Sequence, residues 1–217
     1  TTLPTEADAA ALKARLYRRA VLVDERGQAL RVEALRVGVN YVFDYPFAAT
    51  PCFLLRLARP AAGGVDLKTE GGGTYRWEGG VGPDRTVVAY SAICAHKLTY
   101  PTRQVSFIGY RDAPSPVAGA GKVITCCSDR SVYDPAAGAR VVAGPAPQPL
   151  ATILLEHDAK TGELAAAGTF GGEMFDAFFQ KFGFRLQLEM GDRARASVEG
   201  RAVVRELAAY SAQWAQC

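Results

Sequence analysis

Short apolar segments of strand length alternate with clusters of glycine and proline through most of the chain. The 217 residues include 22 glycines and 12 prolines. Glycine and proline punctuate turns and interrupt helices, and here they gather in segments 59–64, 70–74, 79–84 and 112–121. Many short strands separated by such turns are typical of a β-sandwich or a small barrel. We therefore expect a mostly β protein, with strands within 40–46, 51–58, 86–93, 105–111, 121–126, 139–144, 150–158 and 164–170.

The first 35 residues differ from the middle of the chain. Residues 5–20 are predicted to form a short helix, because Thr5 is a suitable N-cap and apolar residues recur at a spacing of four. Residues 20–35 are predicted to form a hairpin that turns near Gly27.

The C-terminal part changes character again. Apolar residues in 171–184 recur at helical spacing, and Gly183 is predicted to end that helix. Residues 184–190 and 199–207 are predicted to be strands, followed by a closing segment.

Three parts are therefore expected along the chain. Residues 1–30 form an N-terminal arm of helix and hairpin, residues 31–170 form the central β-domain, and residues 171–217 form an α+β C-terminal extension.

Composition and charge argue against two classes of protein. Hydrophobic residues make up 49% of the chain and charged residues 22%, which is ordinary for a soluble globular protein. The net charge of +3 is too small to indicate nucleic-acid binding. No run of eighteen apolar residues is present, so the chain as given is not expected to span a membrane. No signal peptide is visible, and a leader or anchor removed before Thr1 stays open.

Two segments carry residues with metal-binding chemistry. Cys94 and His96 follow the strand predicted at 86–93, and Cys126 and Asp129 follow the strand predicted at 121–126. The five cysteines of the chain are an odd number spread over 217 residues, which is not a disulfide framework. Cysteines placed beside a histidine and an aspartate fit metal ligation better than cross-linking.

The second segment continues in a specific way. Ser131, Tyr133 and Asp134 follow Cys126, and a Gly-Pro-Ala-Pro segment lies at 144–147. In this order, over roughly residues 85–170, the chain resembles the Rieske iron–sulfur proteins. The resemblance implies a Rieske-type β-sandwich or small-barrel fold and a [2Fe–2S] cluster that carries one electron.

The resemblance also implies which residues hold the cluster, in loops at 94–101 and 126–135. The usual second loop of that family reads Cys-Pro-Cys-His-Gly-Ser-x-Phe/Tyr-Asp, with a serine two and an aromatic residue four positions after the ligand histidine. Counting back from Ser131 and Tyr133 places Asp129 where that histidine is expected. Ser131 and Tyr133 would hydrogen-bond to cluster or ligand sulfur. The implied ligands are Cys94, His96, Cys126 and Asp129.

An alternative register pairs Cys127 with Arg130. It misplaces the serine and the aromatic residue and requires a permanent cation to bind iron, so Cys127 is expected to be a small buried thiol. Thr99 and Ser128 lie where the quinol-oxidising branch of the family has a disulfide between the loops. The resemblance therefore implies a branch without that cross-link.

An aspartate ligand has electronic consequences. A carboxylate is a hard anionic ligand that iron accepts, and it makes an oxidised cluster harder to reduce than a neutral imidazole does. We expect a reduction potential below that of an ordinary Rieske centre, with His96 as the one proton-coupled ligand. In the quinol-oxidising branch the second-loop histidine meets the quinol, so Asp129 argues against quinol contact. An empty site, or another metal, is the alternative.

The remaining candidates have ordinary interpretations. His157 is expected to be a structural histidine and Cys52 a core residue. Cys217 would pair with another cysteine only in an oxidising compartment, and its partner stays open. Lys97 and Arg130 flank the implied ligands and would either offset cluster charge or lie solvated at the surface.

Two functions from different classes follow from these observations. The first is an electron-transfer subunit of a respiratory or redox complex, since the sequence shows no nucleophile–base pair and no phosphate loop. Its partner would be a redox protein, a cytochrome or another subunit, with membrane contact only through an anchor or partner subunits. The second is a structural or docking subunit whose cluster is altered or lost.

A ring-hydroxylating oxygenase is excluded, because the two histidines of the chain cannot also supply its second iron site. The resemblance favours the bacterial periplasmic side, and a cytoplasmic location stays open.

Overall fold

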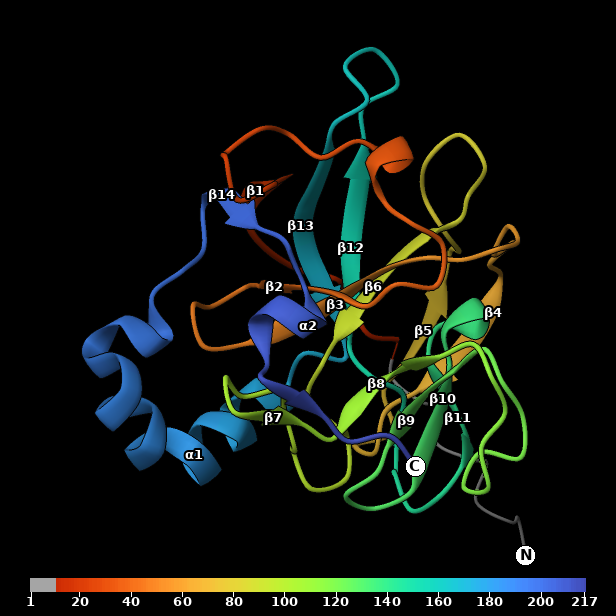
Figure 1. The fold of residues 1–217 in the computed structure, drawn as a ribbon, viewed down its shortest axis with the longest axis vertical. Helices are drawn as coiled ribbons and strands as arrows, with labels where there is room; N and C mark the ends of the chain where they lie inside the picture. Colours follow the sequence, from red (N-terminus) through yellow and green to blue (C-terminus); the bar gives the residue numbers. More distant parts are fainter. Residues whose placement is uncertain (1–10) are drawn as a thin grey trace, which may run out of the picture.

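The computed structural model describes residues 11–217 and is mostly β (Figure 1). The strands are β1 (Arg15–Val23), β2 (Tyr41–Asp44), β3 (Pro51–Arg56), β4 (Val65–Lys68), β5 (Thr74–Trp77), β6 (Val87–Ser91), β7 (Val105–Ser106), β8 (Ile108–Arg111), β9 (Val123–Cys126), β10 (Ser131–Asp134), β11 (Arg140–Ala143), β12 (Thr152–His157), β13 (Leu164–Phe170), β14 (Gly200–Val203), β15 (Arg205–Glu206) and β16 (Gln213–Trp214). The α-helices are α1 (Met174–Met190) and α2 (Leu207–Tyr210), and the 3-10 helices are η1 (Val32–Ala34), η2 (Pro135–Ala137) and η3 (Gly191–Arg195).

The largest sheet has eight strands in the order β14-β1-β13-β12-β6-β3-β2-β15. Its two edge strands, β14 and β15, are separated in sequence by Val204 alone. The N–H of Val204 donates to the carbonyl oxygen of Val23 in β1, at 2.8 Å. The chain therefore brings the two edges together, and the sheet nearly closes into a barrel, which leaves few unpaired edge groups.

Strands β3 and β6 are buried on both faces of this sheet. Alternate residues of a strand point to opposite faces, and here Leu54 and Ala89 pack in one hydrophobic cluster while Phe53 and Tyr90 pack in another. The second cluster includes residues of a four-stranded antiparallel sheet, in the order β11-β10-β9-β8. The two sheets therefore share a core, and burial of a side chain such as Phe53 contributes roughly 1.5–3 kcal/mol.

The mostly β class and the strands predicted between residues 40 and 170 are confirmed, but the predicted N-terminal helix is wrong over residues 15–20. These residues belong to β1, which pairs with β13 and β14. Leu16 is 75% exposed, whereas Ala20 is fully buried, so the apolar residues spaced by four do not form one buried helical face. Residues 5–10 lie outside the described residues. The predicted turn at Gly27 is confirmed, since Gly27 has φ +80° and its N–H donates to the carbonyl oxygen of Asp24. The second strand of the predicted hairpin does not form: after an isolated bridge between Val23 and Ala29, residues 32–34 are the 3-10 helix η1.

The predicted end of the C-terminal helix is also wrong. Helix α1 continues through Gly183 to Met190, so the strand predicted at 184–190 does not form. A glycine in a helix costs about 1 kcal/mol. Beyond the glycine, Leu186 is buried and Arg185 forms an i,i+4 ion pair with Glu189, and these interactions offset that cost. The strand predicted at 199–207 is confirmed as β14 and β15.

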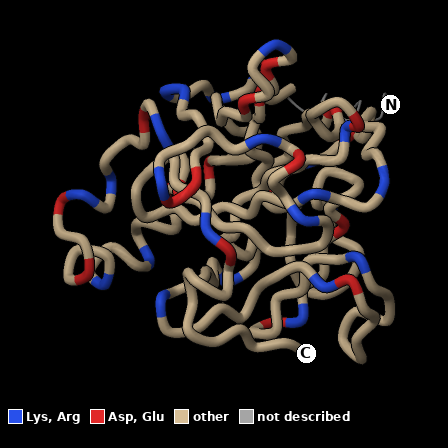
Figure 2. The backbone as a smooth tube through the Cα atoms, turned by 45° about the horizontal axis from the view of Figure 1, so that its top comes forward, with Lys and Arg blue, Asp and Glu red and all other residues tan. Residues whose placement is uncertain are grey.

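Strands from all three predicted parts of the chain share the eight-stranded sheet: β1 from the arm, β14 and β15 from the extension, and the rest from the centre. Residues of both charge signs are interspersed along the backbone (Figure 2). Among the helices of residues 11–217, none is both long and apolar enough to cross a bilayer.

Candidate metal centre

Two loops of the same backbone geometry face each other at the predicted site. In the first, the N–H of Leu98 donates to the carbonyl oxygen of Cys94 at 2.9 Å, and in the second, the N–H of Arg130 donates to that of Cys126 at 2.8 Å. Leu98 and Arg130 both have a left-handed backbone, with φ 62° and 64°. The first loop follows β6, and the second connects β9 to β10. Each loop thus begins at a cysteine and closes four residues later.

The four predicted ligand residues come together between these loops. The sulfur atoms of Cys94 and Cys126 and a carboxylate oxygen of Asp129 lie within 4.8 Å of one another. Asp129 Oδ2 lies 3.3 Å from the Cys94 sulfur and 3.0 Å from Nδ1 of His96. Both cysteines are free thiols with no exposed surface. Two sulfurs and one carboxylate oxygen therefore form one donor group, and the His96 nitrogen contacts that group at Asp129.

Asp129 lies inside the site, whereas Arg130 does not. The Asp129 side chain is 2% exposed, and Arg130 is exposed. Burial by itself would raise the pKa of the Asp129 carboxyl. The backbone N–H of Ser131, which donates to Asp129 Oδ1 at 2.9 Å, and the thiols of both cysteines outweigh burial and lower the pKa below its ordinary value. Asp129 is thus held as an anion next to the thiols.

The hydroxyl of Tyr133 is placed to act on the Cys94 sulfur. It accepts the N–H of Ala95 at 3.1 Å and lies 3.3 Å from the Cys94 sulfur. Because its oxygen already accepts a hydrogen bond, its proton is available for a thiolate at Cys94. Tyr133 has no exposed surface, so this hydrogen bond is shielded from water.

The pKa values of the two thiols shift in opposite directions. A hydrogen bond from the Cys126 thiol lowers the pKa of Cys94, and the Tyr133 hydroxyl adds to this against the opposing effect of burial. The same hydrogen bond, followed by burial, raises the pKa of Cys126. The pair therefore holds its last proton tightly, and loss of that proton needs a positive charge between the sulfurs. A thiolate-ligated metal centre supplies such a charge, so the donor set fits one.

The Gly-Pro-Ala-Pro segment lies directly on the second loop. The N–H of Ala146 donates to the hydroxyl oxygen of Ser131 at 3.1 Å. Gly144 has φ +86°, and a Cβ atom there would lie 2.3 Å from the carbonyl oxygen of Arg130. Only glycine allows this approach, and the segment shields the loop beneath it.

Cys127 is not the small buried thiol that we expected. It forms a disulfide with Cys217, 90 residues later in the chain, with a sulfur–sulfur distance of 2.14 Å. The C-terminus accordingly lies next to β9 in Figure 1, and β16 pairs with β7. The sequence offered one signal for this bond, a terminal cysteine without an assigned partner.

Thr99 and Ser128 do lie opposite each other. Their hydroxyl oxygens are 3.5 Å apart, so a weak polar contact joins the two loops at the position where the resemblance placed the absent cross-link.

The other candidates lie outside the donor group. Cys52 has no exposed surface and packs in the core, as expected. His157 is half-buried at the end of β12. Lys97 is exposed, and its carbonyl oxygen accepts a hydrogen bond from Lys181 at 2.6 Å.

No protein-family model matches the chain. The chain is similar to the soluble domain of the Rieske protein II (soxF) from Sulfolobus acidocaldarius, with 26% sequence identity and a TM-score of 0.48. The alignment covers 70% of this chain and 78% of that chain.

Proposed function

We propose that the protein is a one-electron carrier that holds a [2Fe–2S] cluster between its two loops. The observation that carries this proposal is the convergence of two buried cysteines, a buried aspartate and a histidine from loops of one backbone geometry. Cys94 and Cys126 would hold one iron, and His96 and Asp129 would hold the other. When bound, the cluster accepts and donates one electron at a time.

The chain's own residues bind and shield this centre. The buried thiols give up their protons on binding, as thiolate ligands must. Tyr133 donates a hydrogen bond to the Cys94 sulfur, and the Ser131 hydroxyl, which accepts the N–H of Ala146, keeps its own proton to donate to sulfur. Hydrogen bonds to ligand sulfur stabilise the reduced, more negative state, so these two residues raise the potential.

Asp129 acts in the opposite direction. Its anionic carboxylate stabilises the oxidised state, and we propose a potential below that of a centre with two histidines. Its side chain is 2% exposed, so it cannot meet a quinol in solution or in a membrane. This burial supports a partner other than a quinol.

Among the proposed ligands, His96 would offer the electron its path to the surface. Its side chain is 34% exposed, while both cysteines have no exposed surface. The shortest path to a partner therefore runs through this imidazole, and we propose that a redox protein or another subunit of a redox complex docks over it.

The test is anaerobic purification of the full chain, followed by iron and sulfide analysis and EPR spectroscopy after reduction. We expect about two irons and two inorganic sulfides per chain, and an EPR signal of a reduced [2Fe–2S] cluster. Colourless protein without iron would overturn the proposal in favour of a structural subunit. Stoichiometric zinc without sulfide would assign the same donors to a different metal.

A further inference from the structure

A cavity of about 350 Å³ lies apart from the metal ligands, between the end of β2, the segment after the first loop, the C-terminal part of α1 and helix α2. Its volume lies near the lower end of the range of roughly 300–1,000 Å³ found for small-molecule sites. The ionisable and phenolic residues in its wall are Asp44, Tyr100, Arg103, Glu189, Arg193 and Tyr210.

Two polar atoms in this wall are buried without a hydrogen-bond partner among the described residues. They are Oδ1 of Asp44 and the hydroxyl oxygen of Tyr100. Tyr100 is 8% exposed, and its ring is enclosed by Phe178 and Phe182 at centroid distances of 5.1 and 5.0 Å. An unpartnered buried polar group costs about 1–3 kcal/mol. Within residues 11–217 both groups lack polar partners, and both belong to residues that line this cavity.

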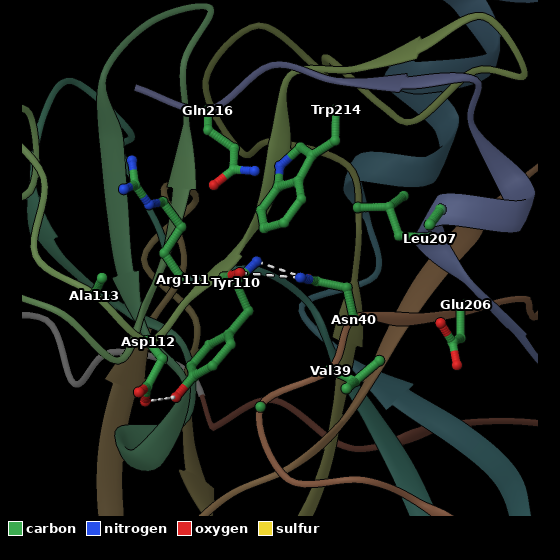
Figure 3. A pocket seen from close by; sticks show the side chains of 12 residues that line it. Val39, Asn40, Tyr110, Arg111, Asp112, Ala113, Glu206, Leu207, Trp214 and Gln216 are labelled. Carbon is green, nitrogen blue, oxygen red and sulfur yellow. Dashed lines mark hydrogen bonds between the residues drawn. The ribbon is translucent and has the colours of Figure 1, made fainter.

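A second cavity, of about 390 Å³, shows the contrast (Figure 3). There Asn40 donates to the carbonyl oxygen of Tyr110 at 2.9 Å and accepts its N–H at 2.7 Å. Arg111 donates to the carbonyl oxygen of Cys217 at 2.8 Å, and Glu206 pairs with Arg36. These polar groups all have hydrogen-bond or ion-pair partners within the protein, so nothing in the described residues of that cavity indicates a missing ligand.

The charges around the first cavity are also incompletely paired. Glu189 forms an ion pair with Arg185 at 2.8 Å. Neither Arg103 nor Arg193 forms an ion pair with another residue of 11–217, and neither does Asp44. One carboxylate and two guanidinium groups are therefore available to a ligand.

We infer that this cavity binds a small zwitterion of amino-acid size, with its ammonium group on Asp44 and its carboxylate on Arg103 and Arg193. A simple anion would meet the Asp44 carboxylate, and a simple cation would meet the two guanidinium groups, so a ligand with both charges fits best.

The state of Asp44 agrees with this assignment. Burial raises the pKa of Asp44 to about 7, against the opposing charges of Arg205 and Arg103. An ammonium group beside the carboxylate would offset the cost of burying its charge.

The experiment is thermal unfolding of the full chain in the presence of each standard L-amino acid separately, with acetate and methylammonium as half-ligand controls. A ligand that binds only the folded state raises Tm as its concentration rises. We expect at least one amino acid to raise Tm, and neither half-ligand to do so. Absence of any shift, or an equal shift with acetate alone, would overturn the inference.

Variants then locate the binding site by calorimetry with the amino acid that raises Tm most. D44N and R103Q should each weaken binding by about tenfold or more, while D66N, which changes an exposed carboxylate on β4, should bind as the wild type does. If D44N fails to fold, R193Q and Y210F provide the same test from other sides of the cavity. Wild-type affinity in all of the cavity variants would sink the idea. The measurement does not depend on the iron content of the metal centre, so it fails or succeeds separately from the proposed function.

Discussion

The two loops of the metal centre have the same backbone but different surroundings. Both close with an N–H that donates to the carbonyl oxygen of a cysteine four residues earlier. The first loop presents His96, whose side chain is 34% exposed, and the second presents Asp129, whose side chain is 2% exposed. The backbone thus fixes where ligand atoms lie, while the side chain within each loop decides charge and access to solvent.

The loops are also held in place differently. The first loop leads into Tyr100, which packs under aromatic residues of α1. The second is a hairpin connection between β9 and β10, joined to the C-terminus through the disulfide between Cys127 and Cys217. One loop is therefore held by a hydrophobic contact and the other by a covalent bond. The centre has one open side, at His96, and one closed side, at Asp129.

The largest effect should come from replacing the cysteine at which each loop begins. C94S and C126S should each abolish cluster assembly, because thiolates are the tight ligands for iron–sulfur clusters. Iron and sulfide analysis of each purified variant measures this. The matched control is C52S, which changes a cysteine that is equally buried but packs elsewhere in the core. Loss of iron in C52S as well would mean that general destabilisation, rather than ligation, explains the result.

Changing Asp129 should make the two loops more alike or remove one ligand. D129H restores a histidine to the second loop, and the exchange of an anion for a neutral imidazole should raise the reduction potential, on the order of 100 mV. D129A should lose the cluster or release it readily. Potentiometric titration followed by EPR measures the first variant, and iron retention the second. A wild-type spectrum and potential in D129A would show that Asp129 is not a ligand.

The third effect concerns the covalent restraint on the second loop. The disulfide spans 90 residues, and a disulfide typically stabilises the folded state by about 2–4 kcal/mol. C217S should lower the free energy of unfolding by that amount under oxidising conditions, measured by urea titration. With a reductant present, wild type and C217S should coincide. Cluster content should be retained, since Cys127 is not among the proposed ligands; bleaching of C127S would contradict the assigned register.

Elements that depend on local sequence pattern were predicted correctly. Elements whose structure depends on contacts with distant residues were predicted wrongly. Glycine and proline clusters delimited the central strands correctly, as in 51–58 for β3. The apolar spacing in 5–20 was ambiguous, and pairing with β13 and β14 makes residues 15–20 a strand. Gly183 reads locally as a helix end, but burial of Leu186 carries α1 past it.

The site shows the same division. The resemblance to the Rieske proteins implied that Cys94, His96, Cys126 and Asp129 lie together. In the folded chain Cys94, Cys126 and Asp129 form one donor group, and His96 contacts Asp129. The disulfide of Cys127 lay beyond that reasoning, because a separation of 90 residues leaves no local signal. The cavity at Asp44 could not be predicted either, since an unpartnered atom is defined only by its three-dimensional neighbours.

The smallest expected effect concerns the left-handed residue that the two loops share, whose side chain has different surroundings in each loop. Leu98 and Arg130 both adopt left-handed conformations, which cost a non-glycine residue roughly 1–2 kcal/mol. A glycine avoids this cost, but its greater flexibility in the unfolded chain lowers the free energy of unfolding by about 0.4–1 kcal/mol. R130G should therefore stabilise the protein by about 0.5–1 kcal/mol, because Arg130 is exposed and its side chain has little packing to lose. L98G should gain less or lose stability, because Leu98 is half-buried against the aromatic cluster of α1. Urea unfolding at equal iron content measures both, with R130A as the control that removes the charge but keeps a Cβ atom. If R130A gains as much stability as R130G, removal of the charge explains the gain and relief of backbone strain does not. The two loops would then be less alike than their hydrogen bonds indicate.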